Sequence, residues 1–135
     1  MVTVLVENRS GADVDEHAAE KLARRVLSAE GIDDGDLGLL FVGPDEMRSL
    51  KREHLGQDEA TDVLSFPIDG RDELPDGVPR QLGDAVLCPQ VVGEKWRAPL
   101  VHGLLHLLGY DHGADMQIRK EKTGRYQSPD YFTVD

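Results

Sequence analysis

The chain has little cysteine, few aromatic residues and a shortage of positive charge, and these shortages exclude several classes of protein. Cys88 is the single cysteine among 135 residues, so no disulfide can form within the chain. No apolar run approaches the roughly 20 residues that a membrane-spanning helix needs. The first seven residues, MVTVLVE, lack the basic start and long apolar stretch of a signal peptide. We therefore expect a cytoplasmic protein without a membrane partner.

Acidic residues dominate the charge balance. The chain carries 15 lysines and arginines against 26 aspartates and glutamates, a net charge of −11. This excess favours solubility and disfavours binding to nucleic acid through bulk charge, and we expect no DNA partner. Two short segments differ, because residues 47–55 and 117–126 are locally basic. A basic groove on an acidic protein is compatible with this pattern. For Arg48, Lys51 and Arg52, which share one predicted helix face, we favour a solvated surface over a phosphate-binding one.

The length and the hydrophobic patterning indicate one α/β domain over residues 1–135, with a loose tail at 123–135. The patterns predict strands at 2–7, 37–42, 61–66 and 83–88, and helices at 14–29, 44–54 and 99–108. Residues 67–82 contain two glycines and three prolines and predict a long polar loop. Residues 89–97 fit no single pattern, and a short helix is expected around 114–122.

Three histidines stand in a spacing that is typical of metal sites. Residues 102–112 read HGLLHLLGYDH, which is H-x-x-x-H-x-x-G-x-x-H. His102 and His106 are four residues apart, so they share one face of the predicted helix. Gly109 allows the chain to leave the helix with a positive φ, and the following turn returns His112 to the same point. The spacing predicts three nitrogen ligands for one metal ion.

We interpret this set as a zinc site with one ion per chain, because three protein ligands leave a fourth position for water, as in catalytic zinc centres. Copper, nickel and iron also bind imidazole. One alternative is a group of hydrogen-bonded core histidines, but burying three imidazoles on an apolar helix is costly without a common partner. Another is a closed structural site with Cys88 as the fourth ligand, against which we favour simple packing of Cys88.

The residue after the first histidine decides the chemistry. Zinc proteases place a glutamate there as general base, whereas this chain has Gly103. Peptide hydrolysis by that route therefore loses its base. Asp111 is an alternative base, but we favour a role in orienting a histidine. The catalytic residues outside the metal site stay unassigned.

Other side chains are weaker candidates. Ser65 is a candidate substrate contact, although a serine that closes a strand is usually structural. Trp96 is a candidate for stacking on a base, and we favour its packing at the start of the buried helix. His17 and His54 lie on predicted helix surfaces.

Three segments together resemble the YbeY family of bacterial zinc-dependent endoribonucleases. The histidine segment at 102–112 resembles the family signature. TDVLSFP at 61–67 and LGDAVLCP at 82–89 resemble two further family motifs, in the family's order. The resemblance covers roughly residues 36–113.

The resemblance implies an α/β (α+β) single domain, with a mixed four-stranded sheet, flanking helices and a buried histidine-bearing helix. It implies one zinc ion on His102, His106 and His112. It also implies cleavage of single-stranded RNA during maturation of the 3′ end of small-subunit ribosomal RNA and in ribosome quality control, with ribosomal subunits or ribosomal proteins as further partners.

The chain departs from the family pattern at three places, one of which is the tail after His112, which lacks the long acidic helix common in relatives. Leu55 stands where many members carry an arginine, and Arg52, one helical turn earlier, is a candidate to cover the same space. The segment 89–101 is shorter than is usual, so its helix must be short. Two alternative functions stay open: a non-catalytic, zinc-stabilised factor that binds RNA or the ribosome, and a metal hydrolase of another substrate.

Overall fold

A mixed four-stranded sheet organises the computed structural model, which describes residues 1–55 and 63–109. The strands are β1 (Val2–Asn8), β2 (Gly35–Phe41), β3 (Val63–Pro67) and β4 (Gln81–Leu87), in the spatial order β1-β2-β4-β3. β1, β2 and β4 are parallel, whereas the edge strand β3 runs antiparallel to β4. The expected mixed sheet with flanking helices is confirmed.

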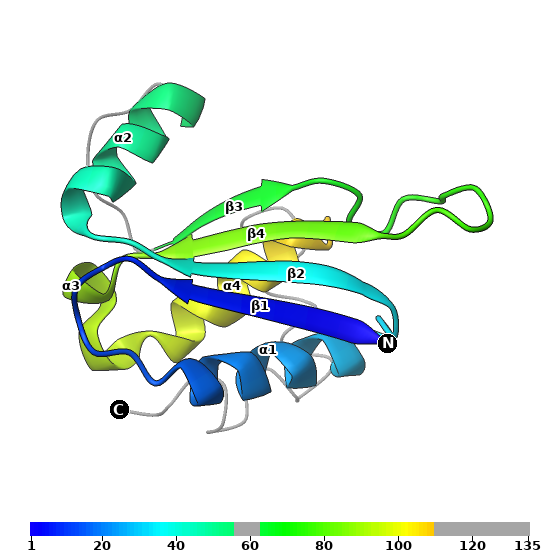
Figure 1. Ribbon diagram of the computed structural model, residues 1–135, viewed down its shortest axis with the longest axis horizontal. Coiled ribbons are helices and arrows are strands. Elements are labelled where there is room, and N and C mark those ends of the chain that lie inside the picture. Colours follow the sequence, from blue (N-terminus) through cyan, green and yellow to red (C-terminus); the bar gives the residue numbers. More distant parts are fainter. Residues whose placement is uncertain (56–62, 110–135) are drawn as a thin grey trace.

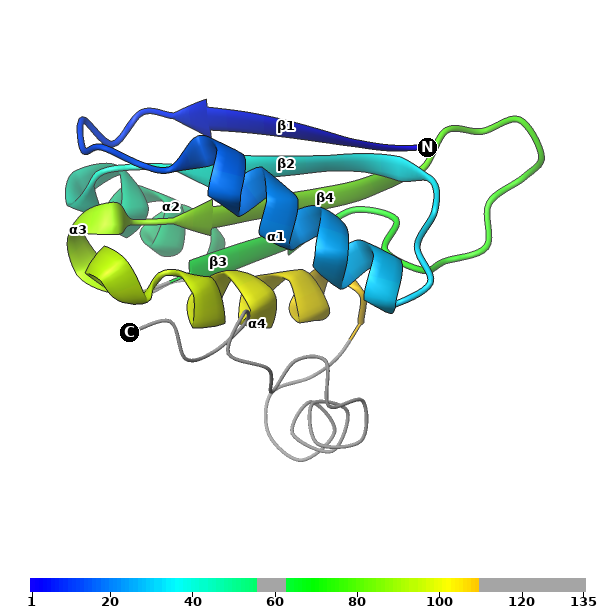
Figure 2. The same ribbon diagram turned by 90° about the horizontal axis from the view of Figure 1, so that it is seen from below.

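Helices lie on both faces of this sheet (Figure 1, Figure 2). They are α1 (Glu16–Ala29), α2 (Pro44–Leu55), α3 (Pro89–Val92), the 3-10 helix η1 (Gly93–Lys95) and α4 (Arg97–Leu107). α1 and α4 cover one face side by side, and α2 lies against the other face at one end. The helix expected around 114–122 and the tail at 123–135 lie outside the described residues.

The main core lies between the sheet and the pair α1 and α4. Leu37, Leu39 and Phe41 are buried because alternate residues of β2 face these helices. From α4, Leu100 and Leu104 are fully buried in the same cluster. The apolar sequence of α4 is explained by this position, since the helix packs against α1, β3 and β4.

A second, smaller core lies under α2 on the opposite face. Met47 of α2 is fully buried against Leu64 of β3 and Val86 of β4. Cys88 belongs to this cluster and is also fully buried. Met47 therefore lies on the inward side of α2. The two cores show that side chains from opposite faces of β4 have different helix partners.

Helix α1 ends at the residue that its sequence predicts and begins two residues later than predicted. The carboxylate of Asp15 accepts a hydrogen bond from the backbone N–H of Ala18 at 3.0 Å, which caps the first turn. Gly31 follows the helix with a φ of +77°, and its N–H donates to the carbonyl of Ser28. Leu22 and Val26 are buried on one side of α1. Helical periodicity and capping therefore locate this element well.

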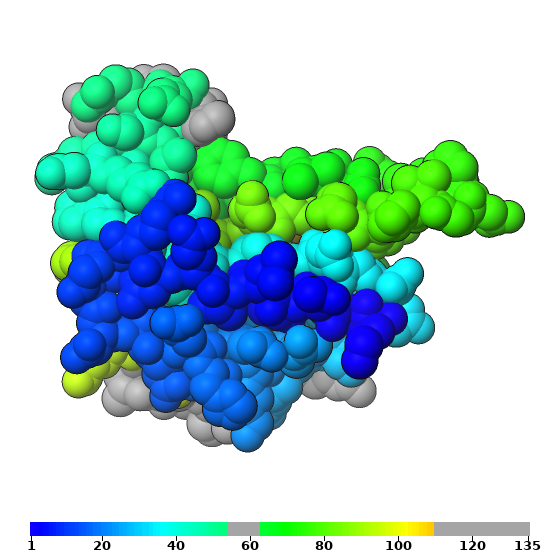
Figure 3. Space-filling model, in the orientation of Figure 1, coloured from blue at the N-terminus to red at the C-terminus, as the bar shows by residue number. Residues whose placement is uncertain are grey.

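The long polar loop between β3 and β4 projects from one end of the molecule, opposite the end where α2 lies (Figure 3). Its base is held by arginine contacts. Arg80 donates to the carbonyl oxygens of Gly70 and Asp72, and Arg71 pairs with the buried carboxylate of Glu30 at the end of α1. The loop is thus tied to the sheet and to α1. Within the described ranges, no helix is long and apolar enough to cross a membrane.

Candidate metal centre

Helix α4 places two of the three predicted ligands beside each other. The ring centroids of His102 and His106 are 5.7 Å apart, with 35° between the ring planes. Both side chains are half-buried, whereas their apolar neighbours Leu104 and Leu105 are fully buried. The helical spacing of four residues produces this arrangement, because such residues lie one above the other on a helix.

The ring separation fits a shared metal ion. With ligand nitrogens at about 2.0–2.1 Å from a tetrahedral ion, two imidazole centroids would lie roughly 5 Å apart. The observed 5.7 Å is close to this separation. The Nε2 atom of His106 is buried from solvent, and a neutral imidazole is a preferred zinc ligand. His102 and His106 therefore meet the distance and donor requirements for two ligands of one ion.

The third predicted ligand lies beyond the described part of the chain. His112 and Asp111 both fall outside it, so their roles remain predictions. The helix does end where the pattern predicts, because Gly109 has a φ of +100° and its N–H donates to the carbonyl of His106 at 3.0 Å. Within residues 1–55 and 63–109, no group of three histidine, cysteine or acidic side chains could hold a metal ion. A three-ligand site that uses His102 and His106 consequently needs a side chain from outside these residues, and His112 is the one that the sequence predicts.

Gly103 follows His102, at the position where zinc proteases have a glutamate, and it faces the sheet. A β-carbon built on Gly103 would lie 2.7 Å from Cγ2 of Val63 and 3.2 Å from Oγ of Ser65. The hydroxyl of Ser65 donates a hydrogen bond to the carbonyl of Gly103 at 2.8 Å. Gly103 therefore allows close contact between α4 and β3. Sequence reasoning identified the missing base but did not identify this packing role.

Cys88 is not brought to the histidines. It packs under α2, on the face of the sheet opposite α4. Its sulfur lies 3.7 Å from the side-chain oxygen of Gln90. The alternative of a closed structural site with Cys88 as fourth ligand is therefore wrong, and the packing role is supported. The physical reason is that Leu87 and Cys88, as successive residues, belong to the two different cores.

The basic face predicted for α2 is not uniformly solvated. Arg48 and Arg52 are exposed, but Lys51 is only 7% exposed. Arg48 lies 3.4 Å from the carboxylate of Asp45, one turn earlier. The expectation of a solvated surface is therefore wrong for Lys51. Helical spacing placed the three residues on one side of α2. It did not show how much of that side is covered by other parts of the same chain. The side chain of Leu55 lies outside the described residues.

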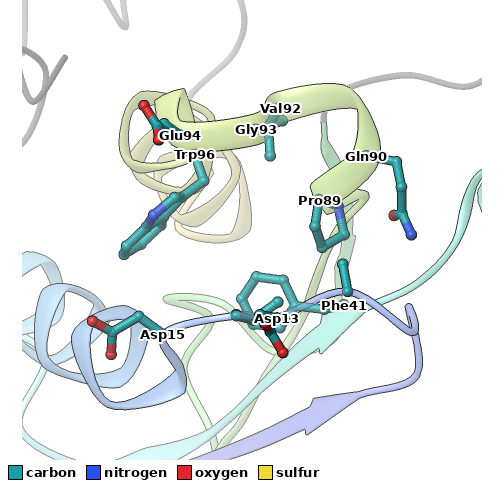
Figure 4. A pocket seen from close by; sticks show the side chains of 11 residues that line it. Asp13, Asp15, Phe41, Pro89, Gln90, Val92, Gly93, Glu94 and Trp96 are labelled. Atoms are coloured by element: carbon teal, nitrogen blue, oxygen red, sulfur yellow. The ribbon is translucent and has the colours of Figure 1, made fainter.

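Trp96 anchors the start of α4. Its indole packs against the main core, and the guanidinium carbon of Arg97 lies 4.3 Å from the ring centroid. Trp96 also lines a pocket of about 290 Å³ beyond the carboxyl ends of the parallel strands (Figure 4). The carboxylates of Asp13, Asp15 and Glu94 surround this pocket, so it is unfavourable for phosphate. The surroundings favour the packing role of Trp96 over stacking on an RNA base.

The three motif segments meet in the structure. β3 contains Val63–Pro67 of the first segment, β4 contains most of the second, and α4 packs against both strands. A family model described as Endoribonuclease YbeY matches residues 5–125. The chain belongs to the YbeY family. The match includes all three predicted ligands, His102, His106 and His112.

Relatives of known name agree with the YbeY assignment. A protein of Salinispora tropica named Endoribonuclease YbeY is 35% identical, with 88% of each chain covered. One of Acidothermus cellulolyticus with the same name is 41% identical, over 84% of this chain and 81% of the relative. The solution structure of TM1509 from Thermotoga maritima has a TM-score of 0.57 and 27% identity, covering 99% of this chain and 91% of that one. Sequence and fold therefore agree over most of the chain.

Proposed function

We propose that this chain is a metal-dependent endoribonuclease whose ion is zinc, one per chain, on His102, His106 and His112. The observation that carries the proposal is the pair of half-buried imidazoles on α4, 5.7 Å apart, in a chain of the YbeY family. A bound zinc ion would polarise a phosphoryl oxygen or activate a water for phosphodiester hydrolysis. The helix contributes by holding the two imidazoles on one face before the ion binds.

We further propose that the substrate is single-stranded precursor RNA of the small ribosomal subunit, cleaved during 3′-end maturation and ribosome quality control. Ribosomal subunits or ribosomal proteins would then be partners, and the cytoplasm the place of action. The proposed domain is residues 1–135, and the family match over residues 5–125 supports this extent. With a net charge of −11, the protein gains little from bulk attraction to RNA, so binding depends on local groups.

Peptide hydrolysis is disfavoured by the position of Gly103. The site of the missing glutamate is packed against Val63 and Ser65. A glutamate at this position would have to displace β3 before it could act as a base. A non-catalytic factor whose zinc only stabilises the fold is also disfavoured, because the named relatives are endoribonucleases.

The test combines metal analysis with cleavage of a precursor of small-subunit RNA. We expect about one zinc per chain in the purified protein, RNA cleavage that a chelator abolishes, and loss of both in His102→Ala and His106→Ala. His17→Ala is the matched control, because His17 is an exposed histidine in the first turn of α1 and is not one of the predicted ligands. Intact RNA after incubation with the zinc-loaded protein would contradict the enzyme proposal. Zinc loss that unfolds a protein without nuclease activity would favour the non-catalytic factor.

A further inference from the structure

The turn that separates the two histidines contains a weak point of helix α4. Gly103 follows His102 directly and lies in the interior of the helix. Glycine is the most flexible residue, and it destabilises a helix interior by about 1 kcal/mol relative to alanine. The separation of His102 and His106 depends on the backbone of this turn. A device that restrains Gly103 would therefore also restrain the two imidazoles.

Ser65 provides such a restraint from the neighbouring strand. Its hydroxyl donates to the carbonyl of Gly103 at 2.8 Å, across 38 residues of sequence. Gly103 also packs closely against β3. A β-carbon on Gly103 would lie 3.2 Å from Oγ of Ser65 and 2.7 Å from Cγ2 of Val63. Hydrogen bond and packing together hold the histidine turn against β3.

The loop after β3 also comes close to the other end of the same helix. A β-carbon on Gly70 would lie 2.8 Å from the carbonyl oxygen of Leu107. The segment from His102 to Leu107 is thus supported near both ends, at Gly103 by β3 and at Leu107 by the loop after β3. His106 lies between these two positions, and His102 directly precedes the first of them.

We propose that Ser65 is a positioning residue for the metal centre, which holds the turn from His102 to His106 in the geometry that binds the ion. The inference rests on the proposed metal site. Metal–ligand distances tolerate deviations of about 0.2 Å, so small changes in the backbone of Gly103 weaken binding. Ser65 is half-buried, and its hydroxyl is engaged with the helix, which accounts for a polar residue in this strand without a direct contact to substrate.

The test measures zinc affinity of the full chain by competition with a chromophoric chelator, together with unfolding of the metal-free protein in urea. We expect Ser65→Ala to bind zinc about tenfold more weakly, in the range seen when supporting groups of metal ligands are removed. Val86→Ala is the control, because Val86 is buried in the core under α2 and does not face α4. It should lower the urea midpoint and leave the zinc affinity unchanged.

A second variant keeps the hydroxyl and guards against a folding defect in Ser65→Ala. Ser65→Thr should bind zinc as the unmodified chain does, and the absorption spectrum of its cobalt form should match that of the unmodified chain. Unchanged zinc affinity in Ser65→Ala, or equal loss in Ser65→Thr, would overturn the role of Ser65 and leave the metal site intact. Absence of stoichiometric zinc in the unmodified chain would instead overturn the proposed metal site, and this inference with it.

Discussion

Single residues with no side chain or a short one determine how closely α4 approaches the sheet. Gly103 is buried and faces Val63 and Ser65, so the absence of its side chain leaves room for α4 to contact β3. The same residue removes the carboxylate that a zinc protease needs. Both consequences follow from the absence of a side chain at one position, but only the structure shows the first. The chemistry and the packing of the histidine helix are therefore linked at Gly103.

Gly103→Ala should destabilise the protein by about 1 kcal/mol, because overpacking costs roughly 1–3 kcal/mol and the gain in helix propensity offsets part of it. The free energy of unfolding in urea measures the change. Removing the opposing methyl groups should relieve the strain. We therefore expect Gly103→Ala to cost less in a Val63→Ala background than in the unmodified chain. Equal costs in both backgrounds would show that Val63 does not limit the space.

Asp15→Ala should destabilise the protein by about 1 kcal/mol through loss of the cap on α1. The carboxylate of Asp15 accepts from the N–H of Ala18, which otherwise has no partner in the first turn of the helix. Asp15→Asn is the control, since its side-chain oxygen can accept the same hydrogen bond. Thermal and urea unfolding measure the stability of both variants. Equal destabilisation by alanine and asparagine would mean that charge, and not the hydrogen bond, is responsible.

At the scale of elements, α4 is positioned by β3, β4 and the loop that joins them. Ser65 contacts the helix at Gly103, and the backbone at Gly70 contacts its end at Leu107. Arg80 binds the backbone of the same loop, and Arg71 ties the loop to Glu30 at the end of α1. The loop between β3 and β4 is therefore a structural support of the histidine helix.

Gly70→Ala should lower the free energy of unfolding by about 2–3 kcal/mol, through a positive φ and a clash with a backbone oxygen. Gly70 has a φ of +51°, and its β-carbon would lie 2.8 Å from the carbonyl oxygen of Leu107. Gly77→Ala is a matched control in the same loop, because Gly77 has a φ of +84° but nothing within 4 Å. It should cost only about 1 kcal/mol. Similar losses for the two variants would exclude a specific contact with α4.

For the whole molecule, metal binding and folding are coupled if the three histidines converge only in the native state. Two of the three histidines lie side by side on α4, and α4 packs against a sheet built from distant segments of the chain. A ligand that binds the native state alone raises stability by an amount that depends on its concentration. Zinc should therefore act as a stabilising ligand of the entire fold.

Zinc at 100 times its dissociation constant should stabilise the protein by about 2.7 kcal/mol. For a domain of this size, that corresponds to a rise in melting temperature on the order of 10 °C. Calorimetry with and without zinc measures the shift. His102→Ala should abolish it, whereas His17→Ala should retain it. A full shift in His102→Ala would place the stabilising ion elsewhere.

Local patterns in the sequence predicted the elements and the histidine pair. Periodicity located α1 and β2, and the spacing of four residues placed His102 and His106 on one face of α4. The mixed sheet was expected from the resemblance of three segments to the YbeY family. The burial of Lys51 was not predicted, because burial depends on segments that pack from elsewhere in the chain. The separation of Cys88 from the histidines was likewise decided by which face of the sheet each residue meets.

The sequence by itself determined the ligand types, their spacing on a helix and the absence of a protease base at Gly103, since these depend only on residue identity and helical geometry. The tertiary structure decided what surrounds them. The hydrogen bond from Ser65 to Gly103 joins residues 38 positions apart, and the contact of Gly70 with Leu107 depends on a loop conformation. No local pattern encodes such contacts, because they exist only once the sheet has brought β3 and the following loop to α4.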